Sequence, residues 1–252
     1  MERLNVRILL LELTRQCNLE CMHCFRGDSE NKYMKEEIIE KIFNNIARIH
    51  TLLLTGGEPL LAINQLKKIT DILSQDKMNI KELIIVTNGS VLTDELINMF
   101  FIMKEKTNLQ IRISSDKFHM LELKKNNLEE NIKFLKQYFN VIEESPNDKV
   151  YIIDKIGRAV NLTKEDIDYI NSIGDKTTKY MLGNKKILEK FRNEYPLPKL
   201  IEDNVVDGSL NIDVYGNITP TYYSFKSEDE NIYSNVRGNK TLKKAISNIK
   251  SM

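Results

Sequence analysis

The sequence lacks the features that mark several classes of protein. Its formal net charge is only +1, so no excess of positive charge is available to bind nucleic acid non-specifically. No apolar run approaches the ~18 residues that a membrane-spanning helix needs, and the first residues do not look like a targeting peptide. We therefore expect a cytoplasmic protein without nucleic-acid or membrane partners. Its 252 residues suit one large α/β domain.

Cysteine is scarce, and the three that occur, Cys17, Cys21 and Cys24, follow the spacing C-x3-C-x2-C. An odd number of cysteines within eight residues argues against a disulfide. Three thiolates could hold one four-iron cluster and leave one iron open for chemistry, whereas a fully ligated cluster mostly carries electrons. A structural zinc site is the alternative, but it needs a fourth ligand. His23 is next to Cys24 and is badly placed to share its metal.

A second motif follows a short apolar run, 52–54, which reads as a buried strand. The run leads into Gly56-Gly57-Glu58-Pro59. Paired glycines let the backbone pass close to a ligand, and Pro59 fixes the exit toward the next helix. Glu58 places a carboxylate at the carboxyl end of a strand, where parallel α/β proteins bind ligands. An ordinary strand-to-helix turn is the other interpretation of these residues.

Together, the cysteine spacing, the aromatic Phe25 after the last cysteine and the motif at 56–59 resemble the radical S-adenosylmethionine (radical SAM) superfamily. The resemblance implies an α/β fold, a partial (β/α)6 TIM-like barrel with its active site at the carboxyl ends of the strands. It implies a [4Fe-4S] cluster on the three cysteines, and SAM, whose amino group the 56–59 motif receives. An electron donor such as flavodoxin or ferredoxin would be a partner. Reductive cleavage of SAM would then give a 5′-deoxyadenosyl radical that abstracts a substrate hydrogen.

Alternating strand and helix patterns agree with this fold. We expect strands at residues 6–14, 52–54, 83–86 and 109–115, and helices at 34–49, 63–73, 93–103 and 121–138. Repeated β-α units of this size predict a parallel sheet with right-handed crossovers. Residues 150–160 read as a fifth strand, with Gly157, Arg158 and Ala159 at its mouth.

Polar residues at the expected strand ends are candidates for the site. Asn88 could touch SAM or substrate, although Asn-Gly is also a good turn. The fourth strand ends in Ser114-Ser115-Asp116, where superfamily members often contact the ribose or carboxylate of SAM, so Ser114 and Asp116 are candidates. Helix capping by Ser115 or Asp116 is the alternative. Arg158 could pair with a carboxylate of SAM or substrate, unless it is a surface arginine. His119 could move a substrate proton, or it could simply pack or be solvated.

The last part of the chain resembles the extension of SPASM and twitch radical SAM proteins. We expect a core at 1–195 and an extension at 196–252, because residues 195–198 have the texture of a linker. A β-hairpin with its turn at 215–217 precedes Gly238-Asn239 and a final helix. Residues 219–223 contain no cysteine, so we expect no auxiliary cluster there. The tail would instead close the barrel and shape the substrate pocket.

The cysteine count limits the second half of the reaction. With every cysteine on the cluster, no thiol remains to donate a hydrogen atom to a product radical; Tyr222 or Tyr223 could replace it. The SPASM-like tail favours modification of a ribosomally made peptide. The alternatives are a small-molecule enzyme that remodels a nucleotide-related heterocycle, a glycyl-radical activating enzyme, and a zinc-stabilised binding module. The last leaves the 56–59 motif without a purpose.

Overall fold

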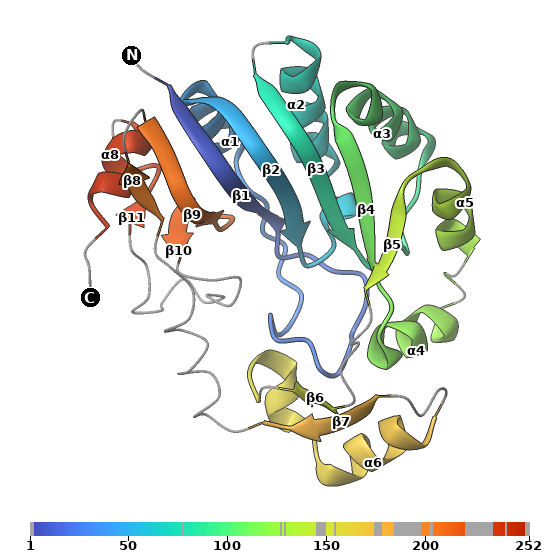
Figure 1. The fold of residues 1–252 in the computed structure, drawn as a ribbon. Helices are drawn as coiled ribbons and strands as arrows, with labels where there is room; N and C mark the ends of the chain where they lie inside the picture. Colours follow the sequence, from blue (N-terminus) through green and yellow to red (C-terminus); the bar gives the residue numbers. More distant parts are fainter. Residues whose placement is uncertain are drawn as a thin grey trace.

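The computed structural model describes residues 3–76, 78–126, 128, 130–144, 150–153, 155–173, 178–183, 198–201, 204–219, 234–239 and 241–249. Within this part of the chain, the main feature is a nine-stranded sheet with the order β11-β10-β9-β1-β2-β3-β4-β5, and β8 pairs with β9 (Figure 1). Its strands are β1 (Leu4–Thr14), β2 (Ile46–Gly56), β3 (Asn79–Thr87), β4 (Asn108–Ser114), β5 (Val141–Glu144), β8 (Lys199–Ile201), β9 (Val205–Ile212), β10 (Asn217–Thr219) and β11 (Ser234–Asn235).

Helices connect the first five strands, all of which run parallel. The helices along the chain are α1 (Glu36–Asn44), α2 (Ile63–Ser74), α3 (Asp94–Lys106), α4 (Lys117–Lys125), α5 (Glu130–Tyr138), α6 (Lys164–Ser172) and α8 (Leu242–Ser247). Helices α1, α2 and α3 cover one face of the sheet (Figure 1). No helix of the described residues is long and apolar enough to span a membrane.

The core lies between the sheet and these helices. Leu9, Leu52, Leu83 and Leu109 stand side by side in four neighbouring strands, and all four are buried. Because successive side chains of a strand point to opposite faces, this row fixes which face meets the helices. The other face is left to line the inside of the partial barrel, so the register of the leucines also decides which side chains can reach a ligand.

The C-terminal strands continue the main sheet on the far side of β1. Strand β9 runs parallel to β1, and β10 returns antiparallel to β9, pairing Ile218 with Ile212. This confirms the expected hairpin, whose turn contains Gly216 at φ +82°, a value that favours glycine. The final helix α8 follows, capped by Thr241, which accepts a hydrogen bond from the backbone N–H of Lys244.

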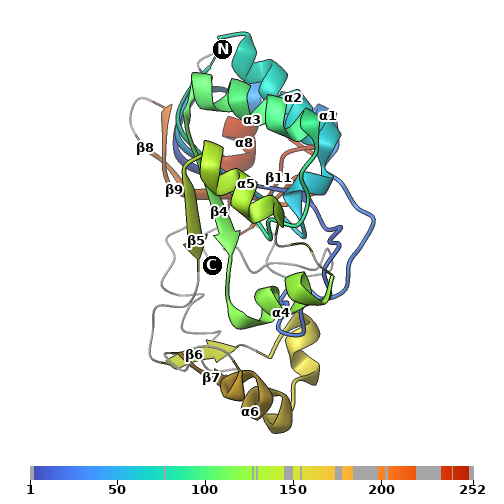
Figure 2. The ribbon, with the colours of Figure 1, turned by 90° about the vertical axis from the view of Figure 1, so that its right-hand side faces the viewer.

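A second, smaller core lies below the carboxyl ends of the main sheet. Strands β6 (Val150–Ile153) and β7 (Lys179–Leu182) form a separate parallel pair, and α6 packs beside them. Both ribbon views place α4 between this layer and the main sheet (Figures 1 and 2). The buried side chains of this core are Phe118, Ile153, Ala159, Leu162, Ile167, Ile170 and Tyr180. The loop of residues 15–35 lies between the two sheets (Figure 1).

Three expected elements differ from the structure. The sequence predicts a helix over 34–49, yet α1 ends at Asn44 and Ile46 begins β2. Ile46 and Ile49 pair with Leu4 and Val6 of β1, so strand pairing of β-branched residues outweighs the helical spacing. The single helix predicted over 121–138 is two helices, α4 and α5. The first starts early, at Lys117, because an N-cap precedes it, and it ends before Asn126.

The position predicted for the fifth strand is also wrong. Residues 150–160 do not form one strand of the main sheet: β6 ends at Ile153, and Gly157–Asn161 is a 3-10 helix. Gly157 has φ +56°, which turns the chain out of the extended conformation. The fifth strand of the main sheet is β5, whose four residues include Glu143 and Glu144 and show no apolar alternation. Thr163 and Asp166 form a capping box at the start of α6.

Candidate functional site

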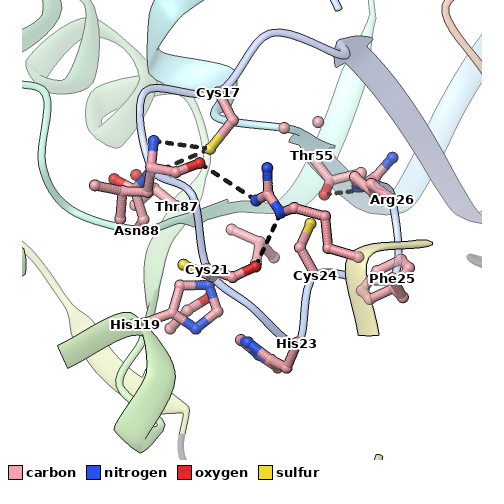
Figure 3. Close-up of a pocket in the computed structure, with 16 residues that line it drawn as sticks. Cys17, Cys21, His23, Cys24, Phe25, Arg26, Thr55, Thr87, Asn88 and His119 are labelled. Carbon is pink, nitrogen blue, oxygen red and sulfur yellow. Dashed lines mark hydrogen bonds between the residues drawn. The ribbon is translucent and has the colours of Figure 1, made fainter. Parts of the chain in front are cut away.

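The three cysteines lie in the loop between β1 and α1, and they border one cavity. Cys21 is buried, Cys17 and Cys24 are partly exposed, and all three thiols are free. The cavity has a volume of about 110 Å³, and Figure 3 shows the three sulfur atoms around it. Its lining residues are Cys17, Leu19, Cys21, His23, Cys24, Phe25, Arg26, Thr55, Gly56, Gly57, Val86, Thr87, Asn88, Ser114, His119 and Arg158.

Gly56 and Gly57 join the end of β2 to the chain that leads into the first cysteine. Gly57 N–H donates to the carbonyl oxygen of Thr14 (2.7 Å), and Glu58 N–H donates to that of Gln16 (2.8 Å). A β-carbon on Gly57 would lie 2.4 Å from the Gln16 oxygen, and one on Gly56 would lie 2.6 Å from the Thr14 oxygen. The paired glycines therefore serve a close contact between two backbone segments, besides lining the cavity.

Glu58 is fully buried and is not among the residues that line the cavity. Its Oε1 accepts hydrogen bonds from Thr87 Oγ1 (2.7 Å) and from Leu60 N–H (2.9 Å), and its Oε2 accepts from Asn88 N–H (2.7 Å). Burial raises the pKa of Glu58, and these hydrogen bonds oppose that rise. Pro59 begins the short 3-10 helix that follows. The carboxyl group thus holds the end of β3 to the 56–59 turn.

Ser114 and His119 line the cavity, whereas Asp116 is not among the lining residues. Asp116 Oδ1 accepts from the N–H groups of Phe118 (3.0 Å) and His119 (3.2 Å), so Asp116 is the N-cap of α4. Asp116 Oδ2 also lies 2.5 Å from His119 Nδ1, and His23 Nε2 lies 3.6 Å from Oδ1. Burial alone would raise the pKa of Asp116, but the two imidazoles hold it well below its usual range.

Arg158 reaches the cysteine loop from the smaller core. Its N–H donates to the carbonyl oxygen of Cys24 (2.9 Å), its Nε to that of Cys21 (3.0 Å) and its Nη2 to that of Leu19 (3.4 Å). A β-carbon on the neighbouring Gly157 would lie 2.5 Å from the Cys24 oxygen. Gly157 and Arg158 therefore bracket the loop, and Nη1 forms no hydrogen bond with any residue that the structure describes.

Sequence reasoning missed a buried carboxylate that joins three parts of the site. Glu12 of β1 is buried; its Oε1 accepts from Arg26 Nη1, and its Oε2 accepts from the N–H of Val214 (3.2 Å). Arg15 Nε lies 3.6 Å from the same carboxylate, and the Arg15 guanidinium stacks over the ring of Tyr215. The available signal was a charged residue within a leucine-rich strand five residues before the first cysteine. Glu12 links the cysteine loop to the C-terminal hairpin.

The histidines do not complete a metal site with the cysteines. Among the described residues, the one group of three His, Cys, Asp or Glu ligand atoms within 4.8 Å of one another is His23, Asp116 and His119. Its 2.5 Å contact between nitrogen and oxygen has the length of a hydrogen bond. Two tetrahedral ligands of one zinc ion would be roughly 3.3 Å apart, given bonds of about 2.0 Å. We therefore interpret this group as hydrogen-bonded.

The three thiols, as they stand, are not gathered closely enough to surround a single ion. The three cysteines form no such group, so their sulfur atoms do not all lie within 4.8 Å of one another. Thiolates around one zinc ion would be about 3.8 Å apart, given bonds of about 2.3 Å. Burial raises the pKa of Cys17 to about 11 and also raises that of Cys21. Metal binding must therefore displace protons from these thiols.

A family model decides the assignment. The model described as the radical SAM superfamily matches residues 11–153, which is more than half of the chain. The chain belongs to the radical SAM superfamily. It is accordingly a radical SAM enzyme, and its cofactors are a [4Fe-4S] cluster and SAM.

Curated relatives share different lengths of this radical SAM chain. A GTP 3′,8-cyclase of Aquifex aeolicus is 27% identical over 234 residues, covering 80% of this chain and 70% of its own. An uncharacterized protein of Methanocaldococcus jannaschii is 28% identical over 92 residues, which cover 35% of this chain and 32% of that protein. The chain thus spans about a third of the length of the second relative in these alignments.

One solved structure supports the fold. The structure of native anSMEcpe with bound AdoMet and Cp18Cys peptide superposes with a TM-score of 0.55 at 12% identity. The superposition covers 98% of this chain and 80% of that one. Together with the parallel sheet β1 to β5, this agrees with the expected partial TIM-like barrel. At such low identity the likeness concerns the fold alone.

Proposed function

We propose that this enzyme cleaves SAM reductively at a cluster held by Cys17, Cys21 and Cys24, and removes a hydrogen atom from a peptide. The observation that carries the first half is the arrangement of three free thiols around one open cavity, beside the 56–59 turn. When bound, the cluster supplies the electron that breaks the C5′–S bond of SAM and yields the 5′-deoxyadenosyl radical. A flavodoxin or ferredoxin would be the electron donor.

The roles of the other residues follow from their places around the cavity. Gly56 and Gly57 would receive the amino group of SAM through their backbone, and Glu58 and Pro59 would hold that turn in shape. Ser114 lines the cavity and is available to the ribose or carboxylate of SAM, and Asn88 lines the same cavity with its amide already bonded to neighbouring residues. Asp116 would act through His119, and Nη1 of Arg158 would meet a carboxylate.

His119 is the candidate for moving a substrate proton. Asp116 holds its Nδ1, so Nε2 is the nitrogen left for a substrate. His119 also lines the cavity. This geometry supports the catalytic interpretation over simple packing, because the hydrogen bond to a carboxylate fixes both the tautomer and the orientation of the ring.

Two observations support a peptide substrate. The structure that shares this fold holds a peptide together with AdoMet. In addition, β5 has no neighbour on its outer side among the described strands, and Ile142 on it is exposed. Its Glu144 pairs with Ser114 of β4, which lines the cavity. An extended peptide could add to this edge and reach the site.

The C-terminal part supports the same function. We propose that residues 196–252 are a degenerate SPASM- or twitch-like extension without an auxiliary cluster. The bond from Val214 N–H to Glu12 ties its hairpin to β1 next to the cysteine loop. In that position the hairpin shapes the substrate pocket. Tyr222 and Tyr223, proposed as hydrogen donors, lie outside the described residues.

A nucleotide-related small molecule is the second candidate substrate, and the GTP 3′,8-cyclase relative favours it. The loaded enzyme, kept anaerobic with SAM and a reductant, can be offered GTP or a library of short peptides. We expect peptides to increase the yield of 5′-deoxyadenosine and to change mass, and GTP to do neither. A new product from GTP, with no effect of peptides, would favour the second candidate. A stable glycyl radical on a co-expressed partner would favour an activating enzyme.

A further inference from the structure

The sulfur of Cys17 differs from the other two in its hydrogen bonds. It accepts from the backbone N–H of Leu19 (3.5 Å) and from the side-chain Nδ2 of Asn88 (3.9 Å). No residue that the structure describes donates a hydrogen bond to the sulfur of Cys21 or Cys24. Figure 3 shows the contact between Asn88 and Cys17 across the upper part of the cavity. Asn88 is thus the one described side chain that donates to a cluster thiol.

The orientation of the Asn88 amide is fixed by its neighbours. The backbone N–H of Ser90 donates to Asn88 Oδ1 (2.8 Å), and a backbone N–H can only donate. The amide nitrogen must therefore be on the other side, where it also donates to Asn18 Oδ1 (3.2 Å). This arrangement points an N–H group, rather than an oxygen, toward Cys17.

The backbone of Asn88 is held as well. Its N–H donates to the buried carboxyl group of Glu58 (2.7 Å), which also accepts from the hydroxyl of Thr87 (2.7 Å). Asn88 itself is 5% exposed, so little water competes for its amide. Glu58, which does not line the cavity, therefore contributes to the site by fixing the residue that contacts Cys17.

We propose that Asn88 stabilises the thiolate of Cys17 and thereby raises the reduction potential of the cluster. Reduction adds negative charge to a cluster and its sulfurs, and an N–H donor stabilises the reduced form more than the oxidised form. Asn88 is a positioning residue, and Glu58 acts through it. The proposal rests on the proposed function, because it requires Cys17 to be a cluster ligand.

The test is a redox titration of the reconstituted full-length enzyme without SAM, followed by the electron paramagnetic resonance signal of the reduced cluster. Asn88→Leu removes the donor at nearly constant size, and Asn88→Asp places a negative oxygen in its place. We expect the midpoint potential to become more negative in Asn88→Leu and more negative still in Asn88→Asp. Val86→Ala also changes the cavity wall but removes no hydrogen-bond donor, so it should keep the wild-type potential.

Wild-type potentials in both Asn88 variants with full iron content would overturn the proposal. If either variant fails to load iron, Asn88→Gln and Asn88→Glu give a second matched pair, which differs only in amide against carboxylate. A potential for the glutamate variant that is not below that of the glutamine variant would then overturn it. Failure of the proposed function is separate: a Cys17→Ala protein that still binds the full complement of iron would show it.

Discussion

Gly57 lies so close to Gln16 that a β-carbon on the glycine would sit 2.4 Å from the carbonyl oxygen of Gln16. The contact brings the end of β2 against the segment that leads into Cys17. Gly56 and Gly57 therefore do two things at once: they border the cavity, and they pack against the residues that lead into the cysteine loop.

This contact predicts the effect of Gly57→Ala. The added methyl group must push two backbone segments apart, which we expect to lower the free energy of unfolding by about 1–3 kcal/mol. Cluster loading should fall as well, because the cysteine loop moves. Gly238→Ala is the matched control, since nothing lies within 4 Å of a β-carbon there. Urea denaturation and iron content measure both variants, and equal behaviour of the two would contradict the structural role.

Substitution of Arg158 should also loosen the cysteine loop. Lysine cannot reproduce the fork that reaches the carbonyl oxygens of Cys21 and Leu19, so Arg158→Lys should lose at least one charge-assisted hydrogen bond. Such a bond contributes about 1.5–3 kcal/mol, and we expect cluster retention in the presence of a chelator to weaken by roughly ten- to a hundredfold. Arg7→Lys, at an exposed ion pair with Asp207, should leave retention unchanged. Unchanged cluster retention in Arg158→Lys would show that the hydrogen bonds from Arg158 to the cysteine loop are dispensable.

The raised pKa of Cys17, about 11, predicts slow alkylation of the protein before the cluster is loaded. Only a small fraction of this thiol is ionised at pH 8, and the thiolate is the reactive form. Because deprotonation increases with pH, the rate of reaction with iodoacetamide should rise steadily from pH 7 to pH 10. Mass spectrometry of the Cys17 peptide measures it. A rate that is already constant at pH 7 would mean that the thiol is ionised in the free protein.

The lowered pKa of Asp116 predicts that the protein loses stability in acid. Its pKa in the folded protein is well below the unfolded value near 3.8, so its contribution is present above that value and is lost as pH falls through the folded pKa. Asp116→Asn lacks this contribution, so its free energy of unfolding should fall less than that of the wild type as the pH is lowered below 4. Asp71→Asn changes an exposed carboxylate and should keep the wild-type slope. Urea denaturation of the protein at stepped pH compares them.

Much of the site could be predicted because its residues stand in contiguous motifs. The cysteine spacing and Gly56-Gly57-Glu58-Pro59 are local patterns, and the strands before them are long apolar runs. The expected helix-capping alternative for Asp116 also proved to be the contact that forms. These features depend on neighbours in sequence, which spacing reveals.

What could not be predicted depends on contacts between distant segments. The partners of Arg158 lie more than 130 residues away, in the cysteine loop. Strand β9 joins the sheet beside β1, 200 residues earlier, and no local pattern specifies that neighbour. Glu58 reads as a ligand in the sequence, whereas its burial under Asn88 arises only once β2 and β3 pair. β5 was missed because four residues ending in two glutamates carry no alternation.

The most direct test of the central claim is the metal content and SAM cleavage of the anaerobically reconstituted protein. The purified chain is supplied with iron and sulfide, reduced with dithionite and given SAM, and 5′-deoxyadenosine is measured. We expect about four iron atoms per chain and formation of 5′-deoxyadenosine that Cys21→Ala abolishes. A protein that takes up one zinc ion and no iron, or a Cys21→Ala variant that forms 5′-deoxyadenosine as fast as the wild type, would contradict the account.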